Sequence, residues 1–189
     1  MPTATLKRTK FTVDEFVKMV DANVFGSTKV ELIDGRVYRM VQKEPHLWAV
    51  SKAMEVLVKA KRPTDWVMCQ GTIQLDLYTM PDPDFLWLAC PMGTPVSEWP
   101  KPLLLLEISS TTYKIDSGIK LRKYAFHGVT DYWIVNLNER RIEVCREPKN
   151  PTGRLKDCHY ASVTHHSAAD RIALLQRPDV RIGADELLP

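Results

Sequence analysis

Two acidic residues lie at the ends of short apolar runs in the middle of the sequence. Asp84 directly precedes the run 85–89, and Glu107 directly follows the run 103–106. Apolar runs of this length, bounded by prolines, are typical of buried strands, and the loop between them allows an antiparallel pair. Since the start of one strand would lie beside the end of the other, we expect the two carboxylates at one edge of a buried sheet.

Two buried carboxylates require a compensating positive charge. An unpaired buried ion costs several kcal/mol, and adjacent carboxylates raise each other's pKa unless a cation lies between them. A hard divalent ion such as Mg²⁺, with Mn²⁺ as a substitute, meets this requirement through carboxylate oxygens. The alternative is that one or both carboxylates form salt bridges or are solvated at a strand end.

The segment after Glu107 predicts a helix that packs close to this pair. Strand side chains alternate, so Ser109 shares a face with Glu107. Residues 115–127 have helical periodicity. The apolar side of this helix consists of Ile115, Ile119, Ala125 and Phe126. Its other side consists of Asp116, Lys120, Lys123 and His127, a pattern that by itself also fits a solvated polar face.

These residues carry a family resemblance. An Asp, a long gap and Glu-x-Ser at a strand end resemble the PD-(D/E)XK nuclease core, with Ser109 in the usual place of Lys. The run LLLLEISSTTYKIDSGIKLRKYAFHGVTDYWIVN is similar to the signature of the bacterial Uma family of restriction endonucleases, and the similarity spans about residues 11–146. The matching positions are Glu107, Ser109, Ser110, Thr111, Asp116, Lys120, Tyr124, Gly128, Val129, Tyr132 and Trp133. The family's SPS is SST here, and its Asp after the YWLV motif is Asn136; we expect neither position to bind metal.

The resemblance implies metal-dependent hydrolysis of a DNA phosphodiester. Because no signal peptide is indicated, the chain is expected in the cytoplasm. Asp84 and Glu107 are expected to hold Mg²⁺, with Asp82 as the fallback for Asp84 and the backbone carbonyl of Ile108 as a further ligand. Lys120 would supply from the helix the ammonium group that Ser109 lacks, and would orient water or stabilise the transition state.

Two residues nearer the N-terminus are additional candidates. VELIDGRVYRM resembles the family's ELIDG hairpin, and Asp34-Gly35 between the strand-like runs of residues 29–41 is a strong hairpin signal. Glu31 on its first strand is by resemblance a further metal ligand, or else an ordinary outward-facing glutamate. His46, which follows Pro45 as in the family's helix start, could contact a phosphate or water, or else be a local cap.

The remaining pattern predicts an α/β fold, and the resemblance implies a restriction-endonuclease-like mixed central sheet flanked by helices. A helix at 13–22 has Thr12 and Glu15 in capping-box positions, with Phe16, Val17 and Val20 facing inward. A helix at 46–61 should bury Leu47, Val50, Met54, Leu57 and Val58. Further strands are expected at 65–77 with a bulge at Gly71, at 131–137, in a hairpin turning at 138–140, and at 159–163 and 171–175, before a last turn at 184–188. The path from 103–108 through the helix to 131–137 should be a parallel crossover.

Composition sets outer limits on the function. A chain of 189 residues with 44% hydrophobic residues is expected to form one domain over 1–189 with a proper core. The net charge of +3 permits a nucleic-acid partner without requiring one. Basic clusters occur at Lys7-Arg8-Lys10, Lys59-Lys61-Arg62 and Lys120-Arg122-Lys123. The scattered cysteines favour no structural zinc site, and neither a membrane span nor a signal peptide is indicated.

Two other function classes remain open at this stage. The chain could be a catalytically inactive nucleic-acid-binding module, or a partner-dependent subunit of a mobile-element or defence system. Related nucleases often work as dimers, because two DNA strands need two sites. The resemblance therefore implies a homodimer, although no stretch of the sequence specifies an interface.

Overall fold

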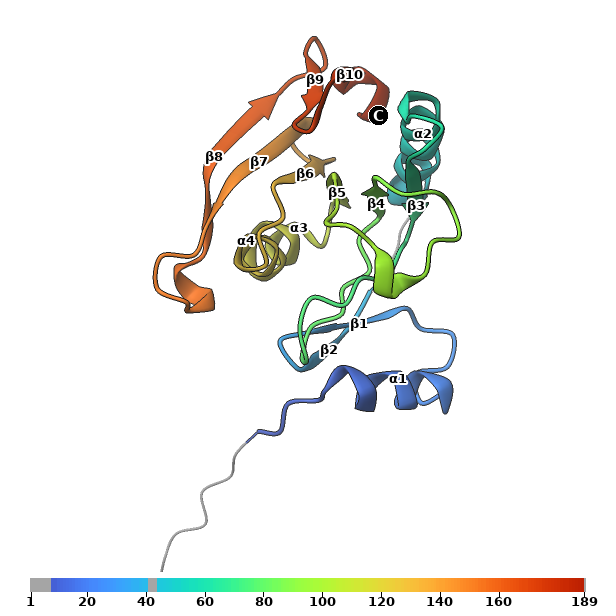
Figure 1. Ribbon diagram of the computed structural model, residues 1–189, viewed down its shortest axis with the longest axis vertical. Coiled ribbons are helices and arrows are strands. Elements are labelled where there is room, and N and C mark those ends of the chain that lie inside the picture. Colours follow the sequence, from blue (N-terminus) through green and yellow to red (C-terminus); the bar gives the residue numbers. More distant parts are fainter. Residues whose placement is uncertain (1–7, 41–43, 189) are drawn as a thin grey trace, which may run out of the picture. The chain divides into compact units, whose positions relative to one another are not determined.

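The computed structural model describes residues 8–40 and 44–188 of the chain (Figure 1). The described residues form two compact units, one from 8–40 and 72–82 and the other from 44–71 and 83–188. Lys7 of the first basic cluster and Val41 of the expected hairpin lie outside the described residues. That the whole chain forms one domain stays a prediction.

The smaller unit is a capped helix packed on a hairpin. Helix α1 (Val13–Asp21) begins with the predicted capping box, in which Thr12 and Glu15 bond to each other's backbone N–H. Val13 and Phe16 form a small core with Leu32. Val17 and Val20 are exposed, so their predicted inward placement is wrong. The core side of this short helix carries positions 13, 16 and 19, the spacing of one helical stripe.

The hairpin is β1 (Val30–Ile33) with β2 (Arg36–Arg39), and Glu31 pairs with Tyr38. Asp34 and Gly35 both have positive φ, as a two-residue hairpin turn requires. The strand expected at 65–77 is wrong beyond Cys69, because Gln70 adopts a left-handed conformation (φ 55°) and residues 72–82 join the smaller unit. Gly71 is no bulge; a Cβ there would lie 3.0 Å from the Met68 side chain.

The larger unit is built on a six-stranded sheet of order β3-β4-β5-β6-β7-β8. Its strands are β3 (Trp66–Cys69), β4 (Phe85–Leu88), β5 (Leu104–Ser109), β6 (Asp131–Asn136), β7 (Arg141–Lys149) and β8 (His159–His166). Strands β5 and β6 are parallel and the other neighbours are antiparallel. The mixed sheet, the β4–β5 pair and the β5–β6 crossover are therefore confirmed.

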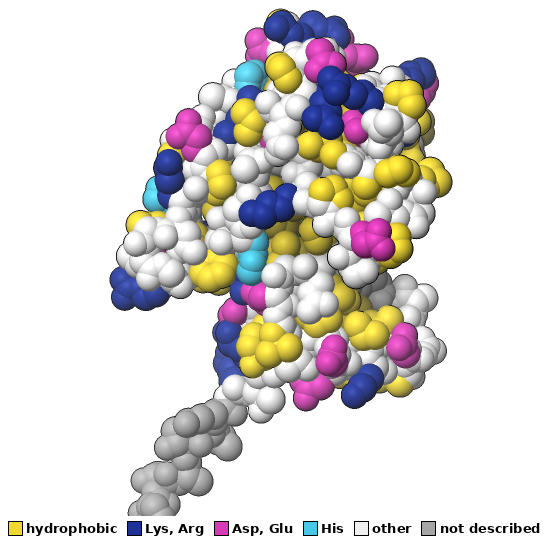
Figure 2. Space-filling model, viewed as in Figure 1, with side chains coloured by type: hydrophobic (Ala, Val, Ile, Leu, Met, Phe, Trp, Pro, Cys, Tyr) yellow, Lys and Arg dark blue, Asp and Glu magenta, His cyan; other side chains and the backbone are white. Residues whose placement is uncertain are grey.

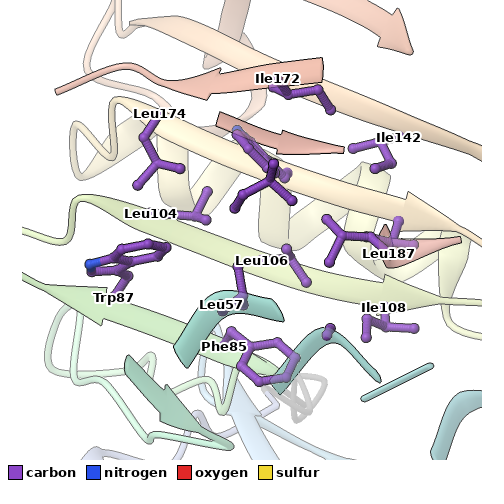
Figure 3. Close-up of a cluster of buried hydrophobic side chains, with 14 of the residues drawn as sticks. Leu57, Phe85, Trp87, Leu104, Leu106, Ile108, Ile142, Ile172, Leu174 and Leu187 are labelled. Carbon is purple, nitrogen blue, oxygen red and sulfur yellow. The ribbon is translucent and has the colours of Figure 1, made fainter. Parts of the chain in front are cut away.

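One face of the sheet carries the main apolar core, shown in Figure 3. Helix α2 (Glu44–Ala60) packs there with β9 (Arg171–Leu174), β10 (Arg177–Gly183) and α5 (Ala184–Leu187). Short 3₁₀ turns η1 (Val96–Glu98) and η3 (Leu155–Asp157) lie in the connecting loops. Strand β10 was not predicted, because its Pro178 and charged residues hide the alternation of a half-buried strand.

The buried stripe of α2 differs in part from the prediction. Val50 and Leu57 are buried, but Leu47 and Val58 are exposed at 46% and 41%. Ala49 and Ala53 are buried instead. Small side chains allow the helix backbone to approach the large side chains of the sheet closely, so hydrophobicity alone misassigns this face.

The opposite face of the sheet is covered by the segment between β5 and β6. It contains α3 (Tyr113–Ile115), the π-helical turn η2 (Asp116–Lys120) and α4 (Leu121–Phe126). The predicted apolar side is wrong for Ile115, Ile119 and Phe126, which are only half-buried, whereas Ala125 is buried as predicted. The side chains that this segment buries are Asp116, Lys120, Lys123, Tyr124 and Ala125. A polar helix face therefore covers the sheet.

Among residues 8–40 and 44–188, no helix has the length and apolarity needed to cross a bilayer.

Adjacent residues of α2 allow a direct test of the core. Leu57→Ala should lower the free energy of unfolding by about 2–5 kcal/mol, since it opens a cavity in the main core. Val58→Ala, the matched exposed control, should cost less than about 1 kcal/mol. Urea unfolding followed by circular dichroism measures both, and equal losses would contradict the orientation of α2.

Candidate active site

Asp84 and Glu107 lie side by side on neighbouring strands. Phe85 pairs with Leu106 across β4 and β5, which places Asp84 opposite Glu107. The backbone N–H of Asp84 donates to Glu107 Oε2 at 3.4 Å. Both side chains are buried, and both lie on the face away from the main core, because the alternate residues Leu104, Leu106 and Ile108 belong to that core. The strand pairing thus concentrates two carboxylates at one point.

The contacts of Asp84 leave one of its oxygens available. Asp84 Oδ2 accepts a hydrogen bond from the backbone N–H of Ile108 at 2.8 Å and lies 3.1 Å from His46 Nε2. In the described part of the chain, Asp84 Oδ1 accepts no hydrogen bond. His46 is buried in the first turn of α2 and reaches the carboxylate pair through Asp84. The ring therefore orients Asp84 rather than capping its own helix.

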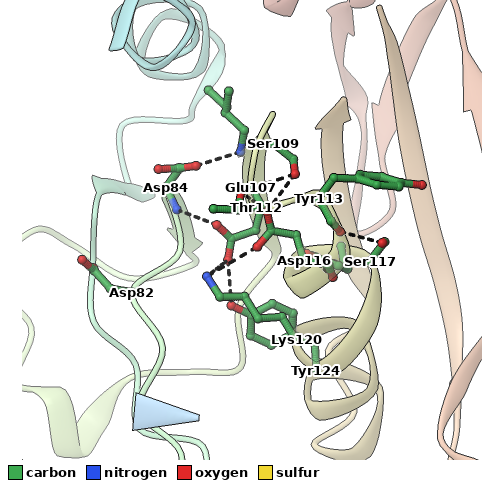
Figure 4. A network of polar contacts seen from close by, with 12 residues as sticks. Asp82, Asp84, Glu107, Ser109, Thr112, Tyr113, Asp116, Ser117, Lys120 and Tyr124 are labelled. Carbon is green, nitrogen blue, oxygen red and sulfur yellow. Dashed lines mark hydrogen bonds and ion pairs between the residues drawn. The ribbon is translucent and has the colours of Figure 1, made fainter. Parts of the chain in front are cut away.

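Glu107 is bound by two donors from the covering helix. Its Oε1 accepts from Lys120 Nζ at 2.9 Å and from Tyr124 Oη at 3.0 Å (Figure 4). Lys120 is 1% exposed, so the ammonium group has almost no solvent around it. Of the alternatives open from the sequence, a salt bridge holds for Glu107.

Asp116 is a third buried carboxylate at this point, and the sequence patterns did not identify it as functional. Its Oδ2 accepts from Ser109 Oγ at 2.8 Å and from Thr112 Oγ1 at 2.6 Å. Its Oδ1 is buried, accepts no hydrogen bond from residues 8–40 and 44–188, and lies 3.7 Å from Lys120 Nζ. One sequence feature could have identified Asp116: the Asp-x-x-x-Lys spacing on the polar side of the helix, together with a Ser on the facing strand.

Burial sets the ionisation of two groups around Lys120. Desolvation raises the pKa of Asp116 above its ordinary value, although Lys120 and the hydroxyls of Thr112 and Ser109 lower it in part. The contribution of Asp116 to folding stability is therefore complete at pH values below the ordinary carboxyl pKa and is lost as pH rises through the raised pKa. At neutral pH the ionised carboxylate lowers the stability of the fold. Burial and then the charge of Glu107 raise the pKa of Tyr132, which stays a neutral donor to the carbonyl of Asp116 at 3.1 Å.

The wide π turn explains how one helical segment presents so many polar groups to the sheet. Asp116 and Lys120 begin and end the turn η2, and both are buried. Single π turns inside α-helices recur at functional sites, because the extra residue re-aims the side chains that follow. After it, Tyr124 and Lys123 face inward where the straight helical periodicity of the sequence predicted Ile119 and Phe126.

Two predicted residues belong to the smaller unit. Glu31 lies on β1, and its contribution to a metal site stays a prediction. Asp82 forms an ion pair with Lys29 at 2.9 Å within that unit. Asp84 is the acid that the larger unit places beside Glu107, so the preference for Asp84 over Asp82 agrees with this geometry.

The donor set limits what the larger unit could bind. In the described ranges, no group of three or more His, Cys, Asp or Glu side chains is arranged as a metal site. The available side-chain ligands are the two adjacent carboxylates, which are hard oxygen donors suited to Mg²⁺ or Mn²⁺. Such ions keep several waters, so two carboxylates can suffice.

Comparison with solved structures supports the fold. The chain is similar to a protein from Anabaena variabilis whose crystal structure is described as that of "a putative nuclease belonging to DUF820". The TM-score is 0.68 at 14% sequence identity, covering 94% of this chain and 97% of that one. At this identity the likeness establishes a shared fold. No curated protein matches the sequence.

The sequence also matches a family profile over most of its length. Residues 13–176 match the Uma2 family, described as "Putative restriction endonuclease". The match includes β4, β5 and the covering helix, and so every residue of the Asp84–Glu107–Lys120 cluster. The chain therefore belongs to the Uma2 family.

Proposed function

We propose that the chain is a metal-dependent endodeoxyribonuclease that hydrolyses phosphodiester bonds with Mg²⁺, for which Mn²⁺ can substitute. The observation that carries the proposal is the buried Asp84–Glu107 pair with the ammonium of Lys120 held 2.9 Å from Glu107. Burying three ionisable groups at one point is costly for stability. Buried, clustered charges of this kind are typical of active sites.

Asp84 and Glu107 would hold the cation. The orientation of Asp84 is already set by the Ile108 N–H and His46, and its Oδ1 accepts no hydrogen bond from the described residues. The backbone carbonyl of Ile108 and the carboxylate of Glu31 are further candidate ligands. A bound divalent cation supplies a Lewis acid that activates water and offsets negative charge on the phosphate.

Lys120 would act on the phosphate from the helix side. Its ammonium is a compact, fixed positive charge, and such preorganised charge stabilises a transition state more than the ground state. Tyr124 donates to the same oxygen of Glu107 and so helps to orient that carboxylate beside Lys120. Ser109 does not reach a reacting group directly; its hydroxyl donates to Asp116.

DNA is the substrate that we infer from the family and the net charge of +3. On the face of the larger unit seen in Figure 2, Lys and Arg side chains are interspersed with Asp and Glu. Binding would therefore depend on separate phosphate contacts rather than on one continuous basic surface there, and would weaken with salt. A homodimer would supply the second site for the second strand, and the cytoplasm is the compartment we infer.

A second function keeps the fold without the chemistry. The ammonium of Lys120 neutralises the carboxylate of Glu107 without a metal ion, which favours a catalytically inactive nucleic-acid-binding module. Salt-sensitive DNA binding with no cleavage in Mg²⁺ or Mn²⁺ would support this function. Cleavage that appears only with an added partner would support the partner-dependent subunit.

Removing either metal-binding carboxylate should abolish cleavage. Asp84→Asn and Glu107→Gln keep the shape of the side chains but remove the charge, so we expect DNA cleavage with Mn²⁺ to fall at least about 1000-fold. Asp65→Asn is the matched control, since Asp65 is also buried but bonds to Trp87. Cleavage of labelled duplex and single-stranded DNA measures the effect, with folding checked by circular dichroism. Full activity in both site variants would refute the assignment.

The two buried lysines of the helix should behave differently. Lys120→Ala should lower kcat about 100- to 1000-fold, because it removes a preorganised charge, while Mn²⁺ affinity changes little. Lys123→Ala, one helical turn further on, should lower kcat less than about tenfold. Single-turnover kinetics on a DNA substrate separate the two effects. The opposite ranking would mean that Lys123 is the functional lysine.

A further inference from the structure

We propose that Asp116 is a positioning residue, which holds the ammonium of Lys120 in its working orientation and is itself held by Ser109 and Thr112. This inference rests on the proposed nuclease function and adds to it a carboxylate that would bind neither the cation nor the DNA. Figure 4 shows Asp116 on the helix between Ser109 of the strand and Lys120.

The two oxygens of Asp116 have different surroundings. Both hydroxyl donors, Ser109 Oγ and Thr112 Oγ1, bond to Oδ2, at 2.8 and 2.6 Å. Oδ1 is buried, has no hydrogen-bond partner in the part of the chain that the structure describes, and lies 3.7 Å from Lys120 Nζ. One oxygen is therefore fixed to the strand and the helix start, and the other is directed at the lysine.

Lys120 requires a second anchor once the site is loaded. In the structure its ammonium donates to Glu107 Oε1, an oxygen of a residue that would also hold the cation. A cation draws charge from Glu107 and weakens that ion pair. A lysine side chain has four rotatable bonds and loses its orientation when its partner weakens. Asp116 lies beside the ammonium and is not one of the proposed ligands of the cation, so its contact at 3.7 Å remains and keeps the ammonium in place.

The position of Ser109 fits this arrangement. In the PD-(D/E)XK pattern a lysine occupies this strand position, whereas here a short hydroxyl leaves the space to Lys120 from the helix. The same hydroxyl donates to Asp116, so strand and helix are tied through one carboxylate. Asp116 and Lys120 are four residues apart in the sequence, and the π turn that they begin and end keeps both side chains buried.

A double-mutant cycle on turnover tests the linkage. Asp116→Asn should lower kcat about 10- to 100-fold, as misplacing a reacting group does, with KM for an oligonucleotide and Mn²⁺ affinity nearly unchanged. In the Lys120→Met background the same change should alter kcat less than about twofold, since there is no ammonium left to position. Equal losses in both backgrounds would overturn the proposal.

Two further variants guard against a merely structural effect. Ser109→Ala, which removes one of the two donors to Asp116 and leaves the charge, should give a smaller loss of kcat that also disappears in the Lys120→Met background. Asp65 is a buried carboxylate away from Lys120, so Asp65→Asn should change kcat by the same factor in both backgrounds. A Ser109→Ala loss that persists at full size without Lys120 would overturn the proposal.

A measurement without DNA separates this inference from the proposed function. At pH 8, Asp116→Asn should raise the urea midpoint more in the Lys120→Met background than in the wild-type chain, because the buried charge then lacks its cation. Equal shifts would overturn the contact itself. If the wild-type chain cleaves no DNA with Mg²⁺ or Mn²⁺, the proposed function fails and the role in turnover fails with it, while the urea comparison still decides whether Asp116 and Lys120 interact.

Discussion

The buried ammonium of Lys120 is the charge on which the arrangement of the larger unit depends. It lies 2.9 Å from Glu107 and 3.7 Å from Asp116, with 1% of the residue exposed. A buried ion pair contributes little net stability, but removal of one partner leaves an uncompensated charge and costs several kcal/mol. The carboxylates of β5 and of the covering helix can therefore stay buried only while this lysine is present. Such a cluster is expensive to keep, and metal-dependent phosphodiester hydrolysis is the reason we propose for it.

One face of the sheet carries the apolar core, and the other carries the candidate active site. Along β5, Leu104, Leu106 and Ile108 enter the apolar core beneath α2, while Glu107 and Ser109 face the helical segment 113–126. Strand β4 brings Asp84 to the same point through its antiparallel register. The parallel crossover to β6 forces the intervening helix onto that face. Chain topology thus assembles the cluster from the start of β4, the end of β5 and the helical segment that follows β5.

The pairing of β4 with β5, and the proximity of two carboxylates that follows from it, could be predicted from the sequence. Apolar runs with a carboxylate at one end determine both the β4–β5 pair and the adjacency of Asp84 and Glu107. The burial of helix faces could not be predicted in the same way. On α2, Ala49 and Ala53 pack inward because they are small, while the larger Leu47 stays exposed. On the helical segment after β5, hydrophobic periodicity predicted the wrong buried face. The buried polar groups there hydrogen-bond to one another, and the π turn changes the direction of the side chains that follow it. Asp116 was missed for the same reason, since a buried carboxylate on a polar stripe looks like a solvated one until its partners are known.

Calorimetric titration of the protein with Mn²⁺ at neutral pH and low salt tests the central claim most directly, in the wild-type chain and in the Glu107→Ala variant. The account predicts saturable binding to the wild-type chain that disappears in the variant, because Glu107 supplies half of the side-chain ligands of the proposed site. Binding of equal strength in both proteins would place the cation elsewhere. No binding to either protein, with DNA present or absent, would contradict a metal site at this sheet edge.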